Sequence, residues 1–322
     1  MTCSRVSRVL LAAAISLWAV GAAVAQTVSL VQRFSGASQS RFGQSVALGD
    51  EFLMVGVVGN QFITPFLGAQ GYVQVCRRTA SGTWAAFQQL RASDGRPRDN
   101  FGSDVALSGN TLVVGAAIGG GPIGGEHGAA YVFGWDGSTW VQQAKLTASD
   151  ANTVDLFGQE VDIDGDTIVV GAIGGNRILD PIGNPVANGS VYVFERAGTA
   201  WVEQRLQEPA ERHSFGMSVA ISGNTICVGM VESHTSASYA QGKAYVYRRA
   251  GAWSMQGELQ APDLGPRDRY GVACDVEGDT IAVGAREAAA PAAPPGTYYV
   301  RIVALNAAGT SPVSNEVAVV VP

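Results

Sequence analysis

Charged residues, histidine and cysteine are all scarce in this chain of 322 residues: 15% of residues are charged, and there are 3 histidines and 4 cysteines. The histidines, His127, His213 and His234, stand far apart, and none is paired at the spacing of metal ligands. The sequence contains no His-Glu-x-x-His zinc motif, no Gly-x-Ser-x-Gly elbow and no phosphate-binding Gly-Lys-Ser/Thr loop. It therefore offers no motif for zinc chemistry, for a serine hydrolase or for nucleotide binding.

Basic residues are also few, with 21 Lys and Arg against 27 Asp and Glu, and they form no patch or stripe. The formal net charge is −6, so nucleic acid is not an expected partner. The only long apolar run lies at residues 9–20. A membrane-spanning helix needs about 20 apolar residues, so no membrane span is expected beyond that run.

The first residues are typical of an export signal. Arg5 and Arg8 precede the apolar run, and residues 23–25, Ala-Val-Ala, fit a small-x-small cleavage site. We expect residues 1–25 to be removed as a signal peptide, leaving Gln26 as the N-terminus of a secreted, extracellular or periplasmic protein. A membrane anchor is the alternative, although no charged stop-transfer pattern follows the run.

Glycine, in contrast, is abundant, with 41 residues, and much of it belongs to an internal repeat. An aromatic-glycine dipeptide opens each of five units, and a Val-Gly dipeptide closes it. The openings are 59, 56, 58 and 55 residues apart, a fixed period that indicates a repeat architecture. The openings are Phe42-Gly43, Phe101-Gly102, Phe157-Gly158, Phe215-Gly216 and Tyr270-Gly271, and the closings are Val55-Gly56, Val114-Gly115, Val170-Gly171, Val228-Gly229 and Val283-Gly284.

Each complete unit is predicted to contain four strands. In the second unit, residues 101–107 alternate between two faces, and residues 108–110, Ser-Gly-Asn, suit a hairpin turn. Residues 111–116 are apolar on both faces, so both sides should be covered, and the small residues at their end allow a neighbouring backbone to approach closely. A third strand begins at Gly128 and a fourth at Trp140.

Such four-stranded antiparallel meanders in series favour an all-β fold, a β-propeller of about five blades with the last one composite or incomplete. A sandwich is the weaker interpretation, because it would leave one face of each strand wet.

The residues of the units also resemble a known family. Phe-Gly-x-Ser-Val-Ala followed by Val-Gly-Ala is similar to the FG-GAP repeat, the blade unit of the integrin α-chain head and of many secreted bacterial proteins. Residues 101–116 and 215–230 match most closely, and the resemblance covers residues 26–286. The resemblance implies a propeller that functions in recognition or cell adhesion outside the cell.

The chain departs from that family at the calcium loop, an Asp-x-Asp-x-Asp-Gly run. Only Asp162, Asp164 and Asp166 approach it, and their spacing is wrong. A bound Ca²⁺ needs several converging oxygens, so these residues are weak metal candidates and an acidic hairpin turn is favoured. No cofactor is expected.

The last residues break the repeat. Residues 287–295 are an Ala/Pro-rich linker, and residues 296–322 resemble the last two strands of a fibronectin type III domain. So short a segment cannot bury a sandwich core alone, and we expect its hairpin to complete the fifth blade, with residues 296–300 in the place of residues 128–132. Residues 27–34 resemble a fourth strand that would close the ring from the other end. The alternative is a truncated or rearranged chain with an open edge.

The cysteines beyond the signal fall on core positions of the repeat. Cys76 aligns with Phe133, Cys227 with Val113, and Cys274 with Val105. They are interpreted as small buried hydrophobic residues rather than as a disulfide framework or a metal set.

An acidic residue stands seven positions before the aromatic residue in four units. One interpretation is a ring of carboxylates that collects cations. The other, which we favour, is a set of loops held by turns and exposed ion pairs. The acids are Asp94, Asp150, Glu208 and Asp263, and in three units an arginine follows four residues later, at Arg98, Arg212 and Arg267.

The best candidates for recognition lie in the loops between the second and third strands, because these loops vary while the strands around them repeat. We predict a non-catalytic binding or adhesion module for an extracellular protein or glycan. The alternatives are a hydrolase that uses acids in the central channel and a structural scaffold without a ligand. The candidate residues are Phe62, Phe66, His127, Arg177, Asp180, His234 and Tyr239.

Overall fold

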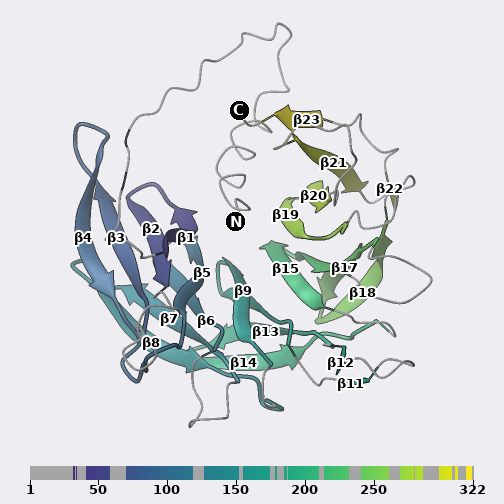
Figure 1. Cartoon of the computed structure of the whole chain (residues 1–322), viewed down its shortest axis with the longest axis horizontal. Coiled ribbons are helices and arrows are strands. Elements are labelled where there is room, and N and C mark those ends of the chain that lie inside the picture. Colours follow the sequence, from purple (N-terminus) through teal and green to yellow (C-terminus); the bar gives the residue numbers. More distant parts are fainter. Residues whose placement is uncertain are drawn as a thin grey trace, which may run out of the picture.

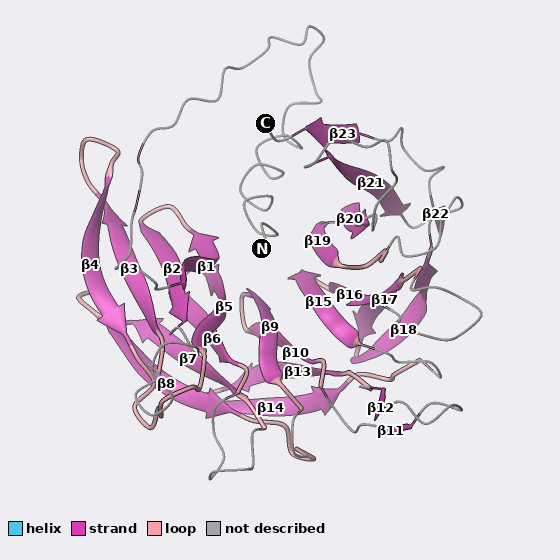
Figure 2. Ribbon diagram, viewed as in Figure 1, coloured by secondary structure: helices cyan, strands magenta, loops and turns pink. Residues whose placement is uncertain are grey.

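The computed structural model describes residues 32, 34, 41–58, 70–118, 127–151, 155–174, 188–209, 214–231, 241–260, 269–278 and 280–285, and the backbone of short segments at 178–179, 185–186, 297–306, 309–310 and 317–320. All regular secondary structure in these residues is β-strand (Figure 2). Within this part of the chain, no helix has the length and hydrophobicity to cross a bilayer.

Apart from one two-stranded hairpin, the described strands form five antiparallel sheets that follow one another along the chain, here called blades 1 to 5. Figure 1 shows the blades side by side in an arc, with the first strand of each toward the middle. This is the predicted all-β propeller architecture. Blade 1 contains β1 (Arg41–Leu48), β2 (Phe52–Val58), β3 (Tyr72–Arg78) and β4 (Trp84–Leu90). Blade 2 contains β5 (Phe101–Ser108), β6 (Thr111–Ala116), β7 (Ala129–Trp135) and β8 (Trp140–Leu146).

Blade 3 contains β9 (Phe157–Asp164), β10 (Thr167–Ala172), β13 (Ser190–Ala197) and β14 (Ala200–Arg205), with a small hairpin of β11 (Ile178–Leu179) and β12 (Pro185–Val186) between its second and third strands. Blade 4 contains β15 (Phe215–Ser222), β16 (Thr225–Met230), β17 (Lys243–Ala250) and β18 (Ala252–Leu259). Blade 5 contains β19 (Ala273–Glu277), β20 (Thr280–Ala285), β21 (Thr297–Asn306), β22 (Gly309–Thr310) and β23 (Val317–Val320).

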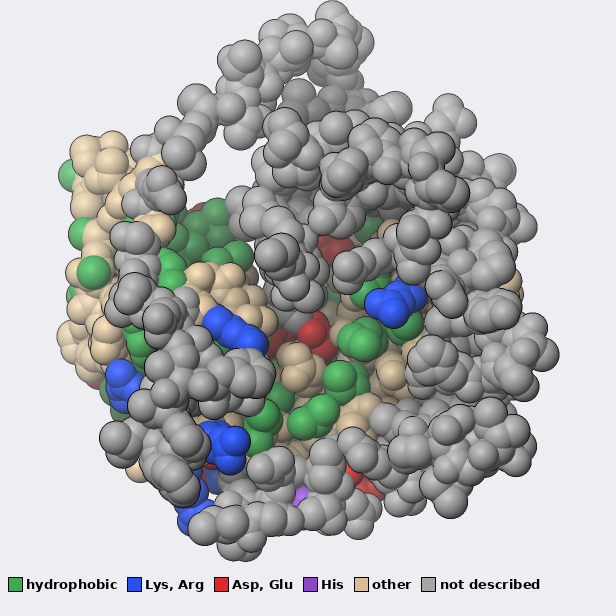
Figure 3. Space-filling model, viewed as in Figure 1, with side chains coloured by type: hydrophobic (Ala, Val, Ile, Leu, Met, Phe, Trp, Pro, Cys, Tyr) green, Lys and Arg blue, Asp and Glu red, His purple; other side chains and the backbone are tan. Residues whose placement is uncertain are grey.

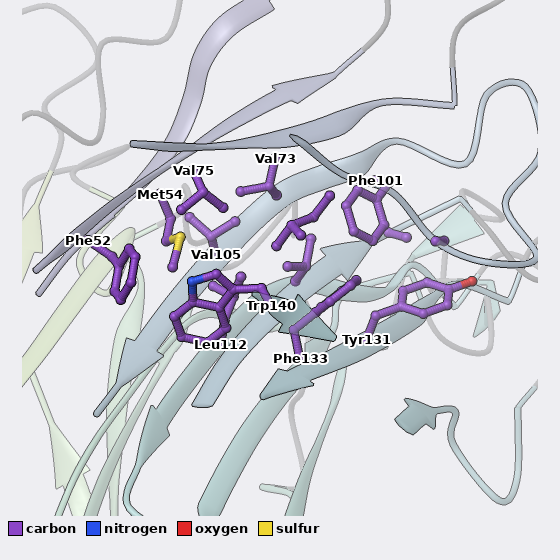
Figure 4. Close-up of a cluster of buried hydrophobic side chains, with 14 of the residues drawn as sticks. Phe52, Met54, Val73, Val75, Phe101, Val105, Leu112, Tyr131, Phe133 and Trp140 are labelled. Atoms are coloured by element: carbon purple, nitrogen blue, oxygen red, sulfur yellow. The ribbon is translucent and has the colours of Figure 1, made fainter. Parts of the chain in front are cut away.

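The hydrophobic core is divided into four clusters, and each cluster takes its residues from two consecutive blades. Between blades 1 and 2, Phe52 and Met54 of β2 share a cluster with Val105, Leu112 and Trp140 of blade 2 (Figure 4). A single sheet cannot bury both of its faces, and stacking the next sheet against it removes that apolar area from water. The two apolar faces of the second strand, expected from the sequence, are therefore both covered.

The glycine of the Val-Gly closing allows two blades to touch in the first four units. A Cβ built at Gly115 of β6 would lie 2.0 Å from the carbonyl oxygen of Gly158, the glycine of the next Phe-Gly opening. The same carbonyl accepts a hydrogen bond from the hydroxyl of Ser103 at 3.2 Å. The equivalent distances at Gly56, Gly171 and Gly229 are 2.3, 2.4 and 1.9 Å. The two dipeptide signatures of the repeat are thus the two halves of one contact between blades.

The glycine of each aromatic-glycine opening adopts a left-handed backbone conformation. Gly102, Gly158 and Gly216 have φ values of 88°, 85° and 85°, which residues with a Cβ rarely adopt. The pairing of β5 with β6 and of β15 with β16 shifts at this dipeptide, so the strand begins with a bulge.

A glutamine of one blade binds the backbone of the tryptophan at the start of the fourth strand in the next blade, with one hydrogen bond donated and one accepted. Gln88 donates to the carbonyl of Trp140 at 2.9 Å and accepts from its N–H at 2.9 Å. Gln204 holds Trp253 in the same way, at 3.1 and 3.4 Å. Gln32 holds Trp84 with both distances at 2.8 Å. Gln32 therefore makes the same two hydrogen bonds to blade 1 that Gln88 and Gln204, both in fourth strands, make to the blades that follow them. This agrees with the predicted resemblance of residues 27–34 to a fourth strand.

Trp253 and Trp140, two of the tryptophans bound by a glutamine, differ in the hydrogen bonding of their indole nitrogens. Nε1 of Trp253 donates to Oε1 of Glu195 at 3.0 Å, whereas buried Nε1 of Trp140 has no hydrogen-bond partner in the described structure. Trp253→Phe is therefore expected to destabilise the protein by about 1 kcal/mol more than Trp140→Phe, because only the first substitution removes a hydrogen bond. Urea unfolding of both variants measures the difference. Equal losses would contradict the assignment of these two partners.

The C-terminal hairpin supplies the third and fourth strands of blade 5. β21 pairs with β20, and β23 pairs with β21. Residues 296–300 in the place of residues 128–132 would put Tyr299 opposite Val283, as Tyr131 is opposite Val114. This predicted register is wrong by two residues, because Tyr299 pairs with Ala285 and Arg301 lies opposite Val283. The resemblance of this segment to a fibronectin type III domain stays a prediction.

Candidate functional site

The described residues that flank the loops proposed for recognition lie on one side of the arc. Isolated parallel bridges join Gly71 to Phe101, Gly128 to Phe157, and Gly242 to Tyr270. Each bridge places the start of a third strand beside the start of the next blade's first strand. The loops that lead into third strands and the loops that lead into first strands therefore share one side, which we call the loop face.

Of the predicted recognition residues, the structure describes His127. Its side chain is half-buried, and its carbonyl accepts a hydrogen bond from the N–H of Phe157 at 3.1 Å. His127 is therefore at the root of its loop, where blade 2 meets blade 3. The other candidates, Phe62, Phe66, Arg177, Asp180, His234 and Tyr239, lie outside the described residues.

Asp94 and Asp150, two of the repeated acids, each bind a tyrosine and a basic residue of the following blade. We call each such set of three side chains a clamp. Oδ1 of Asp94 accepts from the hydroxyl of Tyr131 at 2.9 Å, and Oδ2 accepts from Nζ of Lys145 at 2.5 Å. Asp150 accepts from Tyr192 at 2.8 Å and pairs with Arg205. The partners thus come from the third and fourth strands of the blade, and the favoured interpretation as ion-paired loops describes Asp94 and Asp150.

The tyrosine and the basic residue are direct neighbours across the third and fourth strands, Tyr131 opposite Lys145 and Tyr192 opposite Arg205. Both units have a tyrosine in the third strand and a basic residue at the matching position of the fourth, a recurrence in the sequence that predicts the contact but was not used in the sequence analysis. In blade 4 the equivalent pair is Tyr245 and Glu258. There Glu208 bonds to Ser190 at 2.5 Å and to Arg205 at 2.5 Å, both in the preceding blade.

The clamp shifts the pKa values of its members. Burial raises the pKa of the Tyr131 hydroxyl, and the hydrogen bond to Asp94 raises it further. Burial alone would raise the pKa of Asp94, but hydrogen bonds from Lys145 and Tyr131 outweigh it, and the pKa of Asp94 is lowered. Asp94 is therefore ionised and paired at neutral pH, which leaves it poorly suited to collect a free cation.

The lowered pKa of Asp94 predicts a dependence of stability on pH. A carboxyl group whose pKa is lower in the folded state stabilises the fold above its unfolded value, about 3.9, and this contribution disappears as the pH falls through the folded value. The Asp94 side chain is 50% exposed, so screening by solvent limits the contribution to about 1 kcal/mol or less.

Asp94→Asn is therefore expected to unfold slightly more easily than the wild type at pH 7, and the difference should vanish between pH 4 and pH 2, roughly. Asparagine keeps an oxygen for Tyr131, so the variant isolates the charge. Urea unfolding of both proteins across this range provides the measurement. A difference that persists at the lowest pH would contradict the ion pair.

The weak calcium candidates do not converge on a common point. Oδ2 of Asp162 accepts from the N–H of Ile221 at 2.8 Å, and Oδ2 of Asp164 accepts from the N–H of Gly223 at 2.6 Å. Asp166 pairs with Arg196 at 2.8 Å. In the described residues no group of three or more His, Cys, Asp and Glu side chains forms a potential metal site. Asp162 and Asp164 instead join blade 3 to blade 4, so this hairpin does not fit a Ca²⁺ ion.

Acidic residues of the inner strands also accept hydrogen bonds from backbone amides of the next blade. Oδ2 of Asp104, a buried residue of β5, accepts from the N–H of Val161 in the next blade at 2.8 Å. Figure 3 shows acidic side chains among apolar and basic ones near the middle of the molecule. Asp104 and Asp162 thus bind backbone amides of the following blade, and this use explains their place in the inner strands.

The family model described as FG-GAP repeat matches residues 84–133, 140–194, 207–247 and 253–300, which together make up more than half of the chain. No curated protein is significantly similar to the chain. Similar solved structures include a hypothetical selenium-binding protein from Sulfolobus tokodaii, with 12% identity and a TM-score of 0.49, covering 86% of this chain and 66% of its own. Another is YjhT, with 12% identity and a TM-score of 0.48, covering 86% of this chain and 84% of its own.

Proposed function

Because the chain belongs to the FG-GAP repeat family, we propose that it is an exported, non-catalytic binding module. Its loop face would recognise an extracellular protein or a glycan. The observation that carries the proposal is that the loops vary in sequence, whereas the residues at which they join the third strands are held against the next blade. The loops into third strands differ in length and composition, whereas their roots at Gly71, Gly128 and Gly242 are all bridged to the next blade.

A rigid frame with variable loops is the usual arrangement for recognition, because the frame holds the loops in place while their residues change. Aromatic residues in two of these loops, Phe62 and Tyr239, suit contacts with sugar rings or with a protein surface. Asp94 and Asp150 on the same face are committed to their clamps. The loops rather than the acids are therefore the proposed binding elements.

An array of glycans and extracellular-matrix proteins, probed with the chain from residue 26 onward, tests the proposal. We expect a specific ligand whose affinity falls at least about tenfold in Phe62→Ala or Tyr239→Ala, as for an aromatic contact at the centre of an interface. Val202→Ala is the matched control, because Val202 is 58% exposed and lies on β14, an outer strand away from the loop face. Its binding should not change.

Failure of the array together with turnover of a glycoside or peptide substrate would replace this proposal with the hydrolase alternative. Export is tested separately by sequencing the N-terminus of the protein recovered outside the cytoplasm. The expected first residue is Gln26. A chain that keeps residues 1–25 would contradict the proposed signal peptide.

A further inference from the structure

Cys227 and Cys274 meet at the contact between blades 4 and 5. Cys227 lies in β16 and Cys274 in β19, and both are buried, with exposed fractions of 0% and 3%. They belong to one hydrophobic cluster, and the neighbouring Cys274 is the first cause that raises the pKa of the Cys227 thiol. The structure records both as free cysteines, in agreement with the prediction of small buried residues. The sequence did not reveal that the two lie together.

The backbones of the two strands approach each other closely beside the two cysteines. Two residues after Cys227, a Cβ built at Gly229 would lie 1.9 Å from the carbonyl oxygen of Gly271, three residues before Cys274. That carbonyl also accepts from the hydroxyl of Ser218 at 2.9 Å. A disulfide requires Cα atoms about 4.4–6.8 Å apart, closer than the roughly 10 Å between ordinary stacked sheets, so it needs a close backbone contact of this kind.

The equivalent positions at the other contacts between blades hold no cysteine. They are Met54 and Val105 between blades 1 and 2, Val113 and Val161 between blades 2 and 3, and Val169 and Val219 between blades 3 and 4. Apolar pairs fill this place adequately, so packing does not require cysteine there. Blade 5 is also the blade whose third and fourth strands come from the C-terminal segment.

We propose that Cys227 and Cys274 form a disulfide bond that ties blade 5 to blade 4. The proposal rests on the proposed export, because disulfides persist in oxidising compartments and not in the cytosol. The oxidant is a protein disulfide or a small-molecule disulfide. A thiolate of one cysteine attacks this disulfide, releases one thiol and leaves a mixed disulfide. The other cysteine then attacks the sulfur of its partner and releases the second thiol.

The chain thereby loses two electrons and two protons, which the oxidant takes up as two thiols. In the closed structure the neighbouring Cys274 and burial both raise the pKa of the Cys227 thiol, so little thiolate is present. Oxidation therefore takes place before blade 5 packs against blade 4. Once formed, the bond encloses β17 and β18 in a loop and restricts the unfolded chain.

Counting thiols in the exported protein tests the proposal. In denaturant without reductant, the mature chain should label at a single thiol, Cys76, and at all three after reduction. Cys76→Val should label at none before reduction. The double variant Cys227→Val with Cys274→Val restores the valine pair found between blades 2 and 3, and should label at Cys76 alone under both conditions.

Thermal unfolding gives a second readout. Dithiothreitol should lower the Tm of the wild type and of Cys76→Val by on the order of 10 °C, as expected for a disulfide that closes a loop of this length. It should not change the Tm of the double variant. Labelling of all three thiols in exported, unreduced protein would overturn the proposal. If the chain is not exported, refolding from urea in a glutathione redox buffer tests the disulfide independently of export. A bond between Cys227 and Cys274 in the refolded protein would support the disulfide and would mean that only the proposed export is wrong. Absence of the bond would overturn the disulfide.

Discussion

Gly115→Ala is expected to lower the free energy of unfolding by about 3 kcal/mol or more. The added methyl group would lie 2.0 Å from the carbonyl oxygen of Gly158 and 3.1 Å from the hydroxyl of Ser103. A backbone carbonyl cannot move away without separating β6 from the first strand of blade 3. The substitution therefore opens the contact between blades rather than a local side-chain contact.

Gly284→Ala is the matched control. Gly284 closes the fifth unit as Gly115 closes the second, but among the described residues the nearest neighbour of an added Cβ is the Cβ of Ala273, at 3.4 Å and in the same blade. This is an ordinary contact, so the change in stability should stay within about 0.5 kcal/mol. Urea unfolding of both variants gives the comparison. Equal decreases in the free energy of unfolding would show that each glycine is needed within its own sheet and not for the contact with the next blade.

Phe157→Ala should cost about 3–5 kcal/mol, the usual range for truncating a buried phenylalanine. The side chain of Phe157 is 0% exposed, and its ring lies 5.5 Å from that of Tyr192 and 6.0 Å from that of Phe194. Its cluster joins blade 2 to blade 3. The cavity left by the substitution would lie between two sheets that pack against it from both sides.

Phe42→Ala should cost less than half as much. Phe42 opens the first unit in the same way, but it is only half-buried, and the described residues place no blade before β1. The comparison uses the same substitution at the same position of the repeat, so the difference isolates the cover supplied by a preceding blade. Urea unfolding again measures it. A loss at Phe42 as large as that at Phe157 would mean that a further sheet covers blade 1.

The repeat signatures predicted much of the fold because each has a local physical cause. A small residue at the end of the second strand predicted the close approach of another backbone, and at Gly115 that backbone is the carbonyl of Gly158. The register of the C-terminal hairpin was missed by two residues, Tyr299 pairing with Ala285. A shift of two residues keeps every side chain on the same face of the sheet, so alternation alone does not distinguish the two registers.

The candidate site was less predictable because its contacts join residues far apart in the chain. The arginine four residues after Asp94 is its neighbour in sequence, yet the carboxylate pairs with Lys145, 51 residues away. The weak calcium candidates looked like one loop, but Asp162 and Asp164 bind amides of the next blade. The sequence shows the residue types, and only the stacking of the blades shows which of them meet.

The most direct test of this stacking is hydrogen exchange at the amides of Phe101, Phe157 and Tyr270. Each donates to a carbonyl of the preceding blade, those of Gln70, His127 and Gln241, at 3.0, 3.1 and 2.8 Å. If the blades stand against one another as described, these amides will exchange as slowly as those paired within the central strands of a blade. Exchange at the rate of an open peptide, with the pairs inside each blade still protected, would show that the sheets fold separately and would contradict the arrangement.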